Sequence, residues 1–273
     1  MSVLLQISDP HFGATLPRVV EALAALSAAQ KPDVLVLSGD ITQRARPWQF
    51  TAAKRFLDRL GIAQTLVTPG NHDIPLMDFF TRAFQPYARH RRVFGDDLEP
   101  MLDIPGLLVM CVNTTRRWRH IDGQVSRAQI ERVSARLRAA APDQLRVVVT
   151  HQPVDVPHRR DEHDLLHGHA RAARAWTDAG ADVFMGGHIH LPYVRPLTMR
   201  FPDLQRRSWC VQAGTATSWR VRPDAPNSVN LMRYGLPGRA LRCTVERWDF
   251  VASGGRFELA EVWELDLQRD ASL

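Results

Sequence analysis

The sequence predicts an α/β fold that forms a single domain over all 273 residues. Two observations lead to this prediction. Through the first two thirds of the chain, short apolar runs of strand length alternate with segments whose apolar residues recur at helical spacing. The last third contains successive strand-like runs instead. We therefore divide the expected domain (1–273) into a core at residues 3–195 and a strand-rich part at residues 196–270.

The expected strands of the core are short runs rich in valine, leucine and isoleucine. Runs of this length that are apolar on both faces are typical of strands buried inside a sheet. These runs are Val3–Ile7, Val34–Leu37, Thr65–Val67, Leu107–Val112, Val147–Val149 and Val183–Met185.

Four helices are expected between these strands. One spans Pro17–Ala29, with its proline in the first turn, and another spans Pro47–Leu60 and ends at Gly61. A third begins near Ser126, which is followed three residues later by a glutamine, the spacing of a capping box. The fourth covers Ala170–Ala179.

The last third of the chain predicts strands separated by glycine-containing turns. The turn signals are Pro237-Gly238 and Gly254-Gly255. The strands are Trp209–Gln212, Ser228–Tyr234, Leu241–Phe250 and Phe257–Leu267. From this pattern we expect a second, more antiparallel sheet packed against the first.

The charge and composition restrict the class of protein. The net charge is +6, and Lys31 and Lys54 are the only lysines, so arginine supplies nearly all the positive charge. Arginine suits phosphate recognition, but here it is dispersed, which argues against a nucleic-acid groove. No apolar stretch approaches the roughly 20 residues that span a bilayer. The chain lacks a secretory leader pattern and its three cysteines form no framework, so we expect a cytoplasmic protein.

Polar side chains follow five of the predicted core strands where each strand ends. Because ligands of open α/β sheets bind at the carboxyl ends of strands, we expect these side chains to converge on one edge. They are Asp9, His11, Asp40, Asn71, His72, Asp73, His151, His188 and His190.

This mixture of carboxylate, amide and imidazole groups has the chemistry of a transition-metal site. It suits Mn, Fe, Zn or Co better than an all-oxygen calcium or magnesium site. Apart from His72 and Asp73, these residues supply seven donors, which exceed what one four-coordinate ion needs and suit two ions that share a carboxylate. Two ions roughly 3.5–4 Å apart can hold both the attacking and the leaving oxygen of a phosphoryl transfer.

Taken together and in this order, the motifs resemble those of the calcineurin-like metallophosphoesterases. The matching motifs are Asp9-Pro10-His11, Gly39-Asp40, Gly70-Asn71-His72-Asp73, His151 and Gly187-His188-Ile189-His190. The resemblance runs from residue 3 to about residue 195. It extends more weakly through Gly214-Thr215-Ala216-Thr217, and Pro226-Asn227-Ser228 resembles the bacterial cyclic-nucleotide (class III) phosphodiesterase branch.

The resemblance implies a fold and a set of metal ligands. The fold is a four-layer α-β-β-α sandwich of two mixed sheets, with a dinuclear metal site at the carboxyl-terminal edge of the strands. By residue, the resemblance assigns Asp9, His11 and His190 to the first ion, Asn71, His151 and His188 to the second, and Asp40 to both.

The resemblance also implies a hydrolytic mechanism. A metal-activated hydroxide would attack phosphorus in line with the leaving group. His72 would lie outside the ligand shell and donate a proton to the departing oxygen as general acid. Asp73 would orient or polarise His72. No covalent phospho-enzyme is required.

The expected activity is hydrolysis of a small phosphodiester, with a 3′,5′-cyclic nucleotide as the best single prediction. A UDP-sugar-lipid pyrophosphatase has a related core, but usually carries arginine in place of His72 and needs an apolar channel for acyl chains. A nuclease or a phosphoprotein phosphatase would use the same metals. A non-enzymatic scaffold on this core should have lost ligands, and this chain retains them all.

Several other residues leave two interpretations open. Arg116, Arg117 and His120 follow a predicted strand at the same sheet edge, where they could contact substrate or form a solvated charge run. Trp118 and Trp219 could stack on a nucleobase, although we expect both to serve in interdomain packing. The segment 158–169 is rich in histidine, and we expect a solvated loop rather than a third metal site. The strand-rich end leaves a homodimer open.

Overall fold

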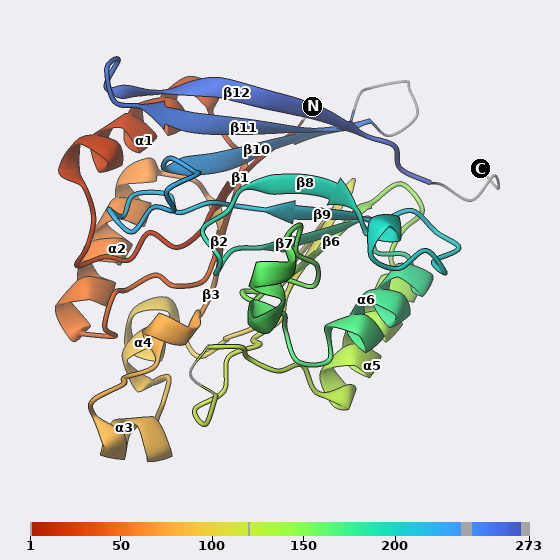
Figure 1. Ribbon diagram of the computed structural model, residues 1–273, viewed down its shortest axis with the longest axis horizontal. Helices are drawn as coiled ribbons and strands as arrows, with labels where there is room; N and C mark the ends of the chain where they lie inside the picture. Colours follow the sequence, from red (N-terminus) through yellow and green to blue (C-terminus); the bar gives the residue numbers. More distant parts are fainter. Residues whose placement is uncertain (1, 120, 236–241, 269–273) are drawn as a thin grey trace.

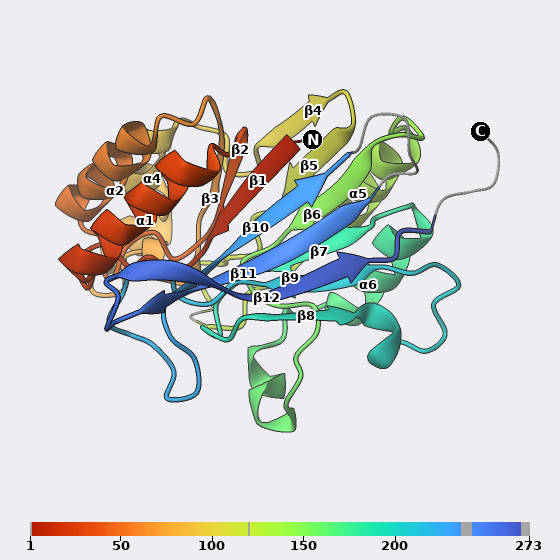
Figure 2. The same cartoon turned by 90° about the horizontal axis from the view of Figure 1, so that it is seen from above.

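The computed structural model describes residues 2–119, 121–235 and 242–268, which form two six-stranded sheets lying face to face (Figures 1 and 2). The first sheet has the order β12 (Arg256–Leu265), β11 (Cys243–Val251), β10 (Ser228–Tyr234), β1 (Ser2–Ile7), β2 (Val34–Ser38), β3 (Gln64–Thr68). The second has the order β4 (Met101–Ile104), β5 (Leu107–Cys111), β6 (Leu145–Val149), β7 (Val183–Gly186), β9 (Trp209–Gln212), β8 (Tyr193–Pro196).

Both sheets are mixed, with a parallel centre that carries the predicted core strands. Strands β1, β2 and β3 run parallel to one another, and so do β5, β6, β7 and β9. Antiparallel strands extend each sheet: β10, β11 and β12 beyond β1, and β4 and β8 at the two edges of the second sheet.

Helices cover the outer face of each sheet, which confirms the four-layer α-β-β-α sandwich. The helices α1 (Pro17–Gln30) and α2 (Pro47–Leu60) lie against the first sheet, and α5 (Arg127–Arg138) and α6 (His169–Asp178) against the second (Figure 2). Shorter segments are α3 (Phe79–Phe84), α4 (Ala88–Phe94), η1 (Asn71–Asp73), η2 (Arg159–Asp164) and η3 (Leu197–Met199).

The apolar side chains separate into layers as strand geometry requires. Successive residues of a strand point to opposite faces of the sheet. In β1, Leu5 and Ile7 pack under α1 and α2, whereas Leu4 packs between the two sheets. In the second sheet, Val147 and Val149 point into the same intersheet layer, and Val148 packs under α5 and α6.

The expectation of a separate carboxyl-terminal sheet is wrong. Strands β10, β11 and β12 extend the first sheet, and β9 belongs to the second. The physical reason lies in β10, which is apolar on both faces: Val229 and Leu231 pack toward the helices, and Met232 packs between the sheets. Such a strand suits the interior of a sheet beside β1. The predicted turn at Pro237-Gly238 and the strand start at Leu241 lie outside the described residues.

The local start and stop signals of the helices are confirmed. Helix α2 covers the predicted residues and ends at Gly61, which has a φ of 65°. At the start of α5, Gln129 N donates to the side chain of Ser126, and Ser126 N donates to the side chain of Gln129. None of the helices in the described part of the chain is long and apolar enough to cross a membrane.

Candidate metal centre

The polar residues predicted at five strand ends converge where the two sheets meet. They follow β1, β2 and β3 of the first sheet and β6 and β7 of the second, at their carboxyl ends. The ring of His151, after β6, reaches across and its Nδ1 lies 2.9 Å from the carbonyl oxygen of Ser38 in β2. The convergence follows from the parallel directions of these strands. Residues 180 positions apart in the sequence thereby become neighbours, and Gln6 Nε2 donates a hydrogen bond of 2.9 Å to the carbonyl oxygen of Gly186.

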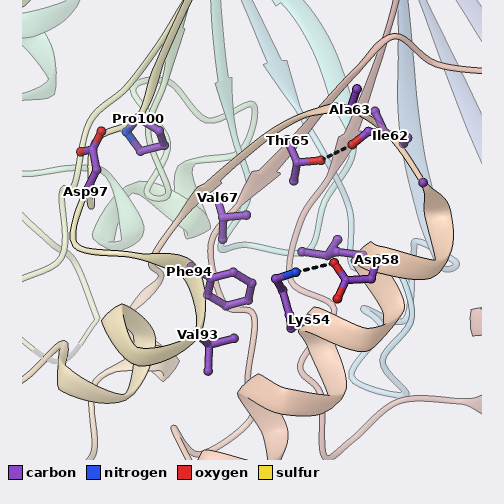
Figure 3. Close-up of a pocket in the computed structure, with 12 residues that line it drawn as sticks. Lys54, Asp58, Ile62, Ala63, Thr65, Val67, Val93, Phe94, Asp97 and Pro100 are labelled. Atoms are coloured by element: carbon purple, nitrogen blue, oxygen red, sulfur yellow. Dashed lines mark hydrogen bonds and ion pairs between the residues drawn. The ribbon is translucent and has the colours of Figure 1, made fainter.

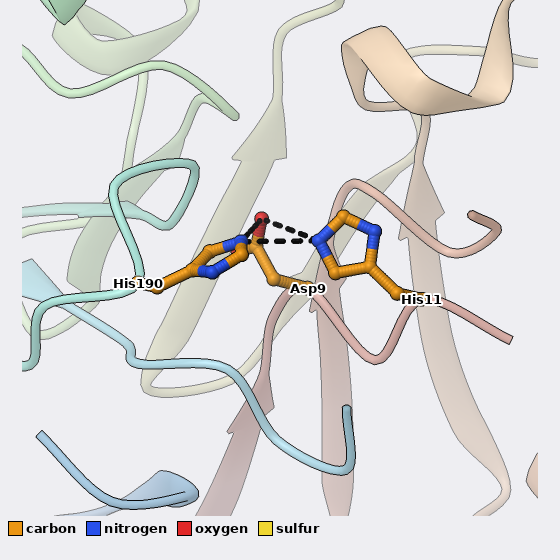
Figure 4. A group of neighbouring side chains, drawn as sticks. All are labelled: Asp9, His11 and His190. Carbon is orange, nitrogen blue, oxygen red and sulfur yellow. Dashed lines mark hydrogen bonds and ion pairs between the residues drawn. The ribbon is translucent and has the colours of Figure 1, made fainter. Parts of the chain in front are cut away.

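The first group of potential ligands is Asp9, His11 and His190 (Figure 4). The Nε2 atoms of the two histidines lie 3.0 Å apart. Asp9 Oδ1 lies 3.3 Å from His190 Nε2 and 3.8 Å from His11 Nε2. Three donor atoms thus point at a common centre.

The second group is Asp40, His151 and His188, with Asn71 beside them. Asp40 Oδ1 lies 3.2 Å from His151 Nε2, and Asn71 Oδ1 lies 3.0 Å from the same nitrogen. The rings of His151 and His188 meet edge to face with centroids 5.1 Å apart. This group therefore offers the carboxylate, amide and imidazole donors that the sequence predicted for one ion.

Asp40 lies between the two groups. Its Oδ1 faces His151, whereas its Oδ2 lies 3.8 Å from His11 Nε2 in the first group. The backbone N–H of His72 donates to Oδ1 at 2.8 Å and fixes the carboxylate. One carboxylate that faces two donor groups is suited to bridging two cations.

Three histidines have their tautomers set by backbone carbonyl groups. The Nδ1 atoms pair with carbonyl oxygens: His72 with Gln43 at 3.0 Å, His151 with Ser38 at 2.9 Å and His190 with Arg220 at 2.6 Å. A carbonyl oxygen only accepts, so each Nδ1 must carry the proton. In the neutral ring this leaves the lone pair on Nε2, directed into the centre, as a metal ligand requires.

The backbone at these residues is held in the left-handed region, which non-glycine residues rarely adopt. Strain of this kind costs about 1–3 kcal/mol per residue and is typical of functional sites. The residues and their φ angles are Asp9 (51°), His11 (47°), Asp40 (48°), His188 (71°) and His190 (55°).

The electrostatics of the centre favour a bound cation. Burial opposes ionisation of Asp9, but the hydrogen bond and charge of His190 lower the pKa of Asp9 to about 2. Burial lowers the pKa of His11 to about 3, so its ring is neutral. Burial also opposes ionisation of Asp40, but the charge of His151 holds the pKa of Asp40 well below its usual range. Ionised carboxylates beside a neutral imidazole are the form that metal binding needs.

Asp9 Oδ1 in the first group and His188 Nε2 in the second are buried and make no hydrogen bond of good geometry, which is the strongest indication that a cation fits. Buried polar atoms without partners are costly and rare. A divalent ion within each group would satisfy these atoms, and the mixed donors suit Mn, Fe, Zn or Co.

The ring of His72 lies at this centre, but Asp73 does not contact that ring. His72 stands edge to face with His11 at 4.9 Å between centroids. The buried carboxylate of Asp73 accepts hydrogen bonds from the backbone of Ile41, Thr42 and Gly70 and from the Thr42 hydroxyl. These bonds tie the loop after β2 to the loop after β3, and the role of Asp73 in orienting or polarising His72 stays a prediction.

A cavity of about 450 Å³ opens beside these residues. Its lining includes Asp40, Asn71, His72, His188 and His190, together with Ile121, Asp164, Ile189, Arg220 and Arg222. The last five were missed by sequence reasoning. Arg220 and Arg222 follow the weak motif 214–217 by a few residues, so the alternation of arginines in Arg220-Val221-Arg222 was the available signal.

Two of the predicted substrate residues after β5, Arg116 and Arg117, have their guanidinium groups paired with other parts of the protein. The Arg116 guanidinium donates to the carbonyl oxygens of Asn113 and Thr115 and to Gln129 Oε1, and Arg117 contacts the carbonyl oxygen of Ala83. Neither lines the cavity. His120 lies outside the described residues.

The expectation that two tryptophans serve in interdomain packing is wrong. Trp118 and Trp219 are 68% and 62% exposed. Both belong to loops, after β5 and after β9, whose neighbouring residues Ile121 and Arg220 line the cavity. Loops at the rim are not covered by the sheet layers, so the aromatic side chains remain in contact with solvent.

The histidine-rich segment 158–169 forms the short helix η2 and contributes an acid to the cavity. Asp164 Oδ1 lies 3.6 Å from His188 Nε2. Among the described residues, none of the four histidines of this segment belongs to a group of potential metal ligands. His163 is exposed, and His167 contacts Asp122.

A second hollow, of about 430 Å³, lies between the end of α2, β3 and α4 (Figure 3). Its charged side chains Lys54 and Asp58 pair with each other. Val67, Val93 and Phe94 supply apolar lining. This hollow holds none of the residues of the metal-type groups.

Comparison with known proteins agrees with this geometry. The family model described as calcineurin-like phosphoesterase matches residues 2–192. A protein of Rhodococcus erythropolis, described as a probable cyclic nucleotide phosphodiesterase, is 25% identical over 202 residues. The alignment covers 68% of this chain and 64% of the length of that protein.

Solved structures with the same fold share little sequence. A dimetal phosphatase from Danio rerio has a TM-score of 0.65 at 13% identity, with 98% of this chain and 99% of that chain covered. A purple acid phosphatase from yellow lupin (Lupinus luteus) has a TM-score of 0.72 at 11% identity, with 99% and 54% covered. The fold, the family match and the two donor groups agree, and this chain belongs to the calcineurin-like phosphoesterases, a family of phosphoester hydrolases that depend on two metal ions.

Proposed function

We propose that this chain is a phosphodiesterase that works with two divalent ions, Mn, Fe, Zn or Co, held at the five strand ends. Asp9, His11 and His190 would hold the first ion, Asn71, His151 and His188 the second, and Asp40 both. The observation that carries the proposal is the position of Asp40, whose two carboxylate oxygens face different donor groups. Ions in such a pair polarise the phosphoryl group, activate water for attack and stabilise the developing charge.

The residues of the chain prepare this chemistry. Asp9 and Asp40 supply ionised carboxylates. When the rings of His151 and His190 are neutral, their carbonyl partners leave the Nε2 lone pairs directed inward. Asp73 acts as a positioning residue, because it ties together the loops that carry Asp40 and Asn71.

His72 is the proposed general acid. Its Nδ1–H donates to the carbonyl oxygen of Gln43 at 3.0 Å, which holds the ring in place. Its Nε2 is the ring nitrogen that Gln43 does not engage, and His72 lines the cavity. From Nε2 the ring would give a proton to the departing ester oxygen. Without that proton the leaving group would depart as a free alkoxide.

A 3′,5′-cyclic nucleotide is the proposed substrate. The similarity to the Rhodococcus protein supports this choice. A cavity of about 450 Å³ is within the usual range for sites of small organic ligands. The exposed ring of Trp219, adjacent in sequence to the cavity residue Arg220, offers a flat apolar face for a base.

One observation favours a lipid-linked phosphodiester, such as a UDP-sugar lipid, as the second candidate. Helix α3 has no buried residue and exposes Phe79, Phe80 and Phe84, each more than 70%. Arg117 joins α3 to the loop that carries the cavity residue Ile121. Exposed apolar surface of this kind is typical of a binding site. Against this candidate, residue 72 is histidine.

We also infer a cytoplasmic location. A second copy of this chain is the partner that we propose for a homodimer. Cys111, Cys210 and Cys243 are buried, and Cys111 and Cys210 are free thiols, which suits a reducing compartment. The edge strand β12 exposes Leu259 and Val262, which would offer an apolar surface to a second copy.

The experiment that tests the proposed function is metal reconstitution. The protein is stripped with chelator, Mn, Fe, Zn, Co or Mg is restored singly, and hydrolysis of bis(p-nitrophenyl) phosphate is compared with that of p-nitrophenyl phosphate. We expect metal-restored diesterase activity that falls sharply in His72→Ala and persists in Arg174→Met, a surface control paired with Asp203. A folded wild type that binds no metal would refute the proposal.

The substrate is tested in the same preparation. Cyclic nucleotides and UDP-linked lipids are supplied separately to the reconstituted enzyme. Turnover of the cyclic nucleotide that decreases in Trp219→Ala supports the first candidate. Turnover confined to the lipid, and decreased in Phe80→Ser, supports the second.

A further inference from the structure

The cavity is lined by two arginines that differ in their electrostatic partners. Arg222 is neutralised: its Nη1 lies 3.1 Å from Asp161 Oδ1, and its Nε lies 3.3 Å from Asp224 Oδ1. It also donates to the carbonyl oxygen of Ile189 at 3.3 Å. The two carboxylates therefore largely neutralise its positive charge.

Arg220 has no carboxylate partner within residues 2–119, 121–235 and 242–268. Its Nη1 donates to Gln43 Oε1 and lies near His72 Nε2, both at 3.2 Å. These partners are a neutral amide oxygen and a ring nitrogen. The guanidinium carries five N–H donors, so most of them remain available for a ligand.

The backbone of Arg220 is fixed to the metal centre. Its carbonyl oxygen accepts the proton of His190 Nδ1 at 2.6 Å, and its N–H donates to Ser218 Oγ at 3.0 Å. The side chain then crosses to His72, the proposed general acid. Arg220 therefore joins the first donor group to the residue that would face the leaving group.

We propose that Arg220 binds a non-bridging oxygen of the substrate phosphate and is a specificity-determining residue for phosphodiesters. This inference rests on the proposed function. A guanidinium fork matches the geometry of phosphate oxygens and binds them with charge-assisted hydrogen bonds. Gln43 is a positioning residue that holds the fork beside His72 before substrate binds.

The charge of the cavity wall sets the preferred substrate charge. A phosphodiester carries one negative charge, whereas a phosphomonoester carries nearly two at neutral pH because its second pKa is about 6. The described wall offers one uncompensated guanidinium, and the carboxylate of Asp164 lines the same cavity. Ions bound at the metal centre would attract both classes of substrate. Outside the metal donors, the described wall adds one guanidinium, which matches a singly charged phosphate better than a doubly charged one.

The experiment compares Arg220→Met, Arg220→Lys and the control Arg174→Met in the metal-loaded enzyme. For Arg220→Met we expect KM for bis(p-nitrophenyl) phosphate and Ki for inorganic phosphate to rise about 10- to 100-fold, the usual effect of losing a hydrogen bond to a charged group. Metal content should match the wild type. Arg220→Lys should recover part of the loss. The control Arg174→Met should behave as wild type.

Two further measurements keep the inference separate from the proposed function. Gln43→Leu should raise KM a few-fold with metal content unchanged, since it removes a partner of the guanidinium and leaves every proposed metal ligand intact. Calorimetric titration with inorganic phosphate measures binding even when no diester is hydrolysed. If the wild type is inactive but binds phosphate more tightly than Arg220→Met does, the result contradicts the proposed function and supports the anion-binding role of Arg220. KM, Ki and phosphate affinity within twofold of wild type in Arg220→Met would overturn the inference.

Discussion

The two walls of the cavity are built in different ways. One wall consists of the strand ends that carry Asp40, Asn71 and His188, and Asp40 and Asn71 are buried there. The other consists of the segments 158–164 and 218–224, whose charged side chains are partly exposed and joined by ion pairs such as Arg222–Asp161 and Arg160–Asp224. The first wall is fixed by the two sheets, and the second by contacts between loops.

The difference separates two tasks. The strand-end wall has the donor chemistry for metal ions, and its left-handed backbone angles leave little freedom for change. The loop wall can change its charge without disturbing a strand, and loops of this kind commonly determine specificity. We therefore expect substitutions in the first wall to abolish activity and substitutions in the second to alter substrate preference.

The largest effect is expected for Asp40→Ala. This change removes the carboxylate that faces both donor groups. Loss of metal-based charge stabilisation worth several kcal/mol corresponds to roughly a thousandfold decrease in kcat/KM. Diesterase rates and metal content by mass spectrometry measure it. Asp58→Ala, an exposed helix residue, is the control. Two bound ions and wild-type rates in Asp40→Ala would remove Asp40 from the centre.

This division also explains what the sequence could predict. Asp9, Asp40 and His188 follow apolar runs directly, so strand prediction alone places them at one sheet edge. The pairing of Arg222 with Asp161 joins segments 61 residues apart that belong to no regular element in common. No periodic pattern encodes such a contact. For the same reason the sequence did not show that β10 would enter the first sheet beside β1, since pairing partners are chosen by packing on both faces.

Gly70→Ala should disrupt the strand-end wall without removing any donor. A β-carbon at residue 70 would lie 2.0 Å from the backbone nitrogen of Asp40 and 2.2 Å from its Oδ1. Because both atoms belong to the centre, the loops after β2 and β3 would have to separate. We expect a loss of stability of about 2–4 kcal/mol or the loss of bound metal.

The matched control is Gly254→Ala, where the nearest atom to an added β-carbon is Glu258 Oε1 at 3.3 Å, at the end of a half-exposed side chain. Chemical denaturation and metal analysis compare the two variants. Equal stability and equal metal content would show that the close approach at Gly70 is dispensable.

Metal removal should destabilise the strand-end wall as a unit. Ions bound to the folded state alone stabilise it by about 3–4 kcal/mol at 100- to 1,000-fold excess over Kd. For a chain of this size, that corresponds to roughly 5–15 °C in the melting temperature. Thermal unfolding with chelator and with added metal measures the shift. In Asp40→Ala the shift should shrink strongly, and an equal shift in that variant would place the stabilising ions elsewhere.

The smallest and most selective effect is expected for Asp161→Asn in the loop wall. The substitution removes the carboxylate that holds Arg222 Nη1 at 3.1 Å, so a second guanidinium gains charge available to the cavity. A partly solvated ion pair contributes up to about 1 kcal/mol, which corresponds to roughly a fivefold change in preference. The ratio of p-nitrophenyl phosphate to bis(p-nitrophenyl) phosphate hydrolysis should rise by that amount, because the doubly charged monoester benefits more from an added cation.

Asp224→Asn, which removes the more exposed partner of the same arginine, should move the ratio in the same direction by less. A fall in the ratio, or an equal loss of both activities with lowered metal content, would mean that Asp161 supports the metal centre instead, and the two walls would then not be separable.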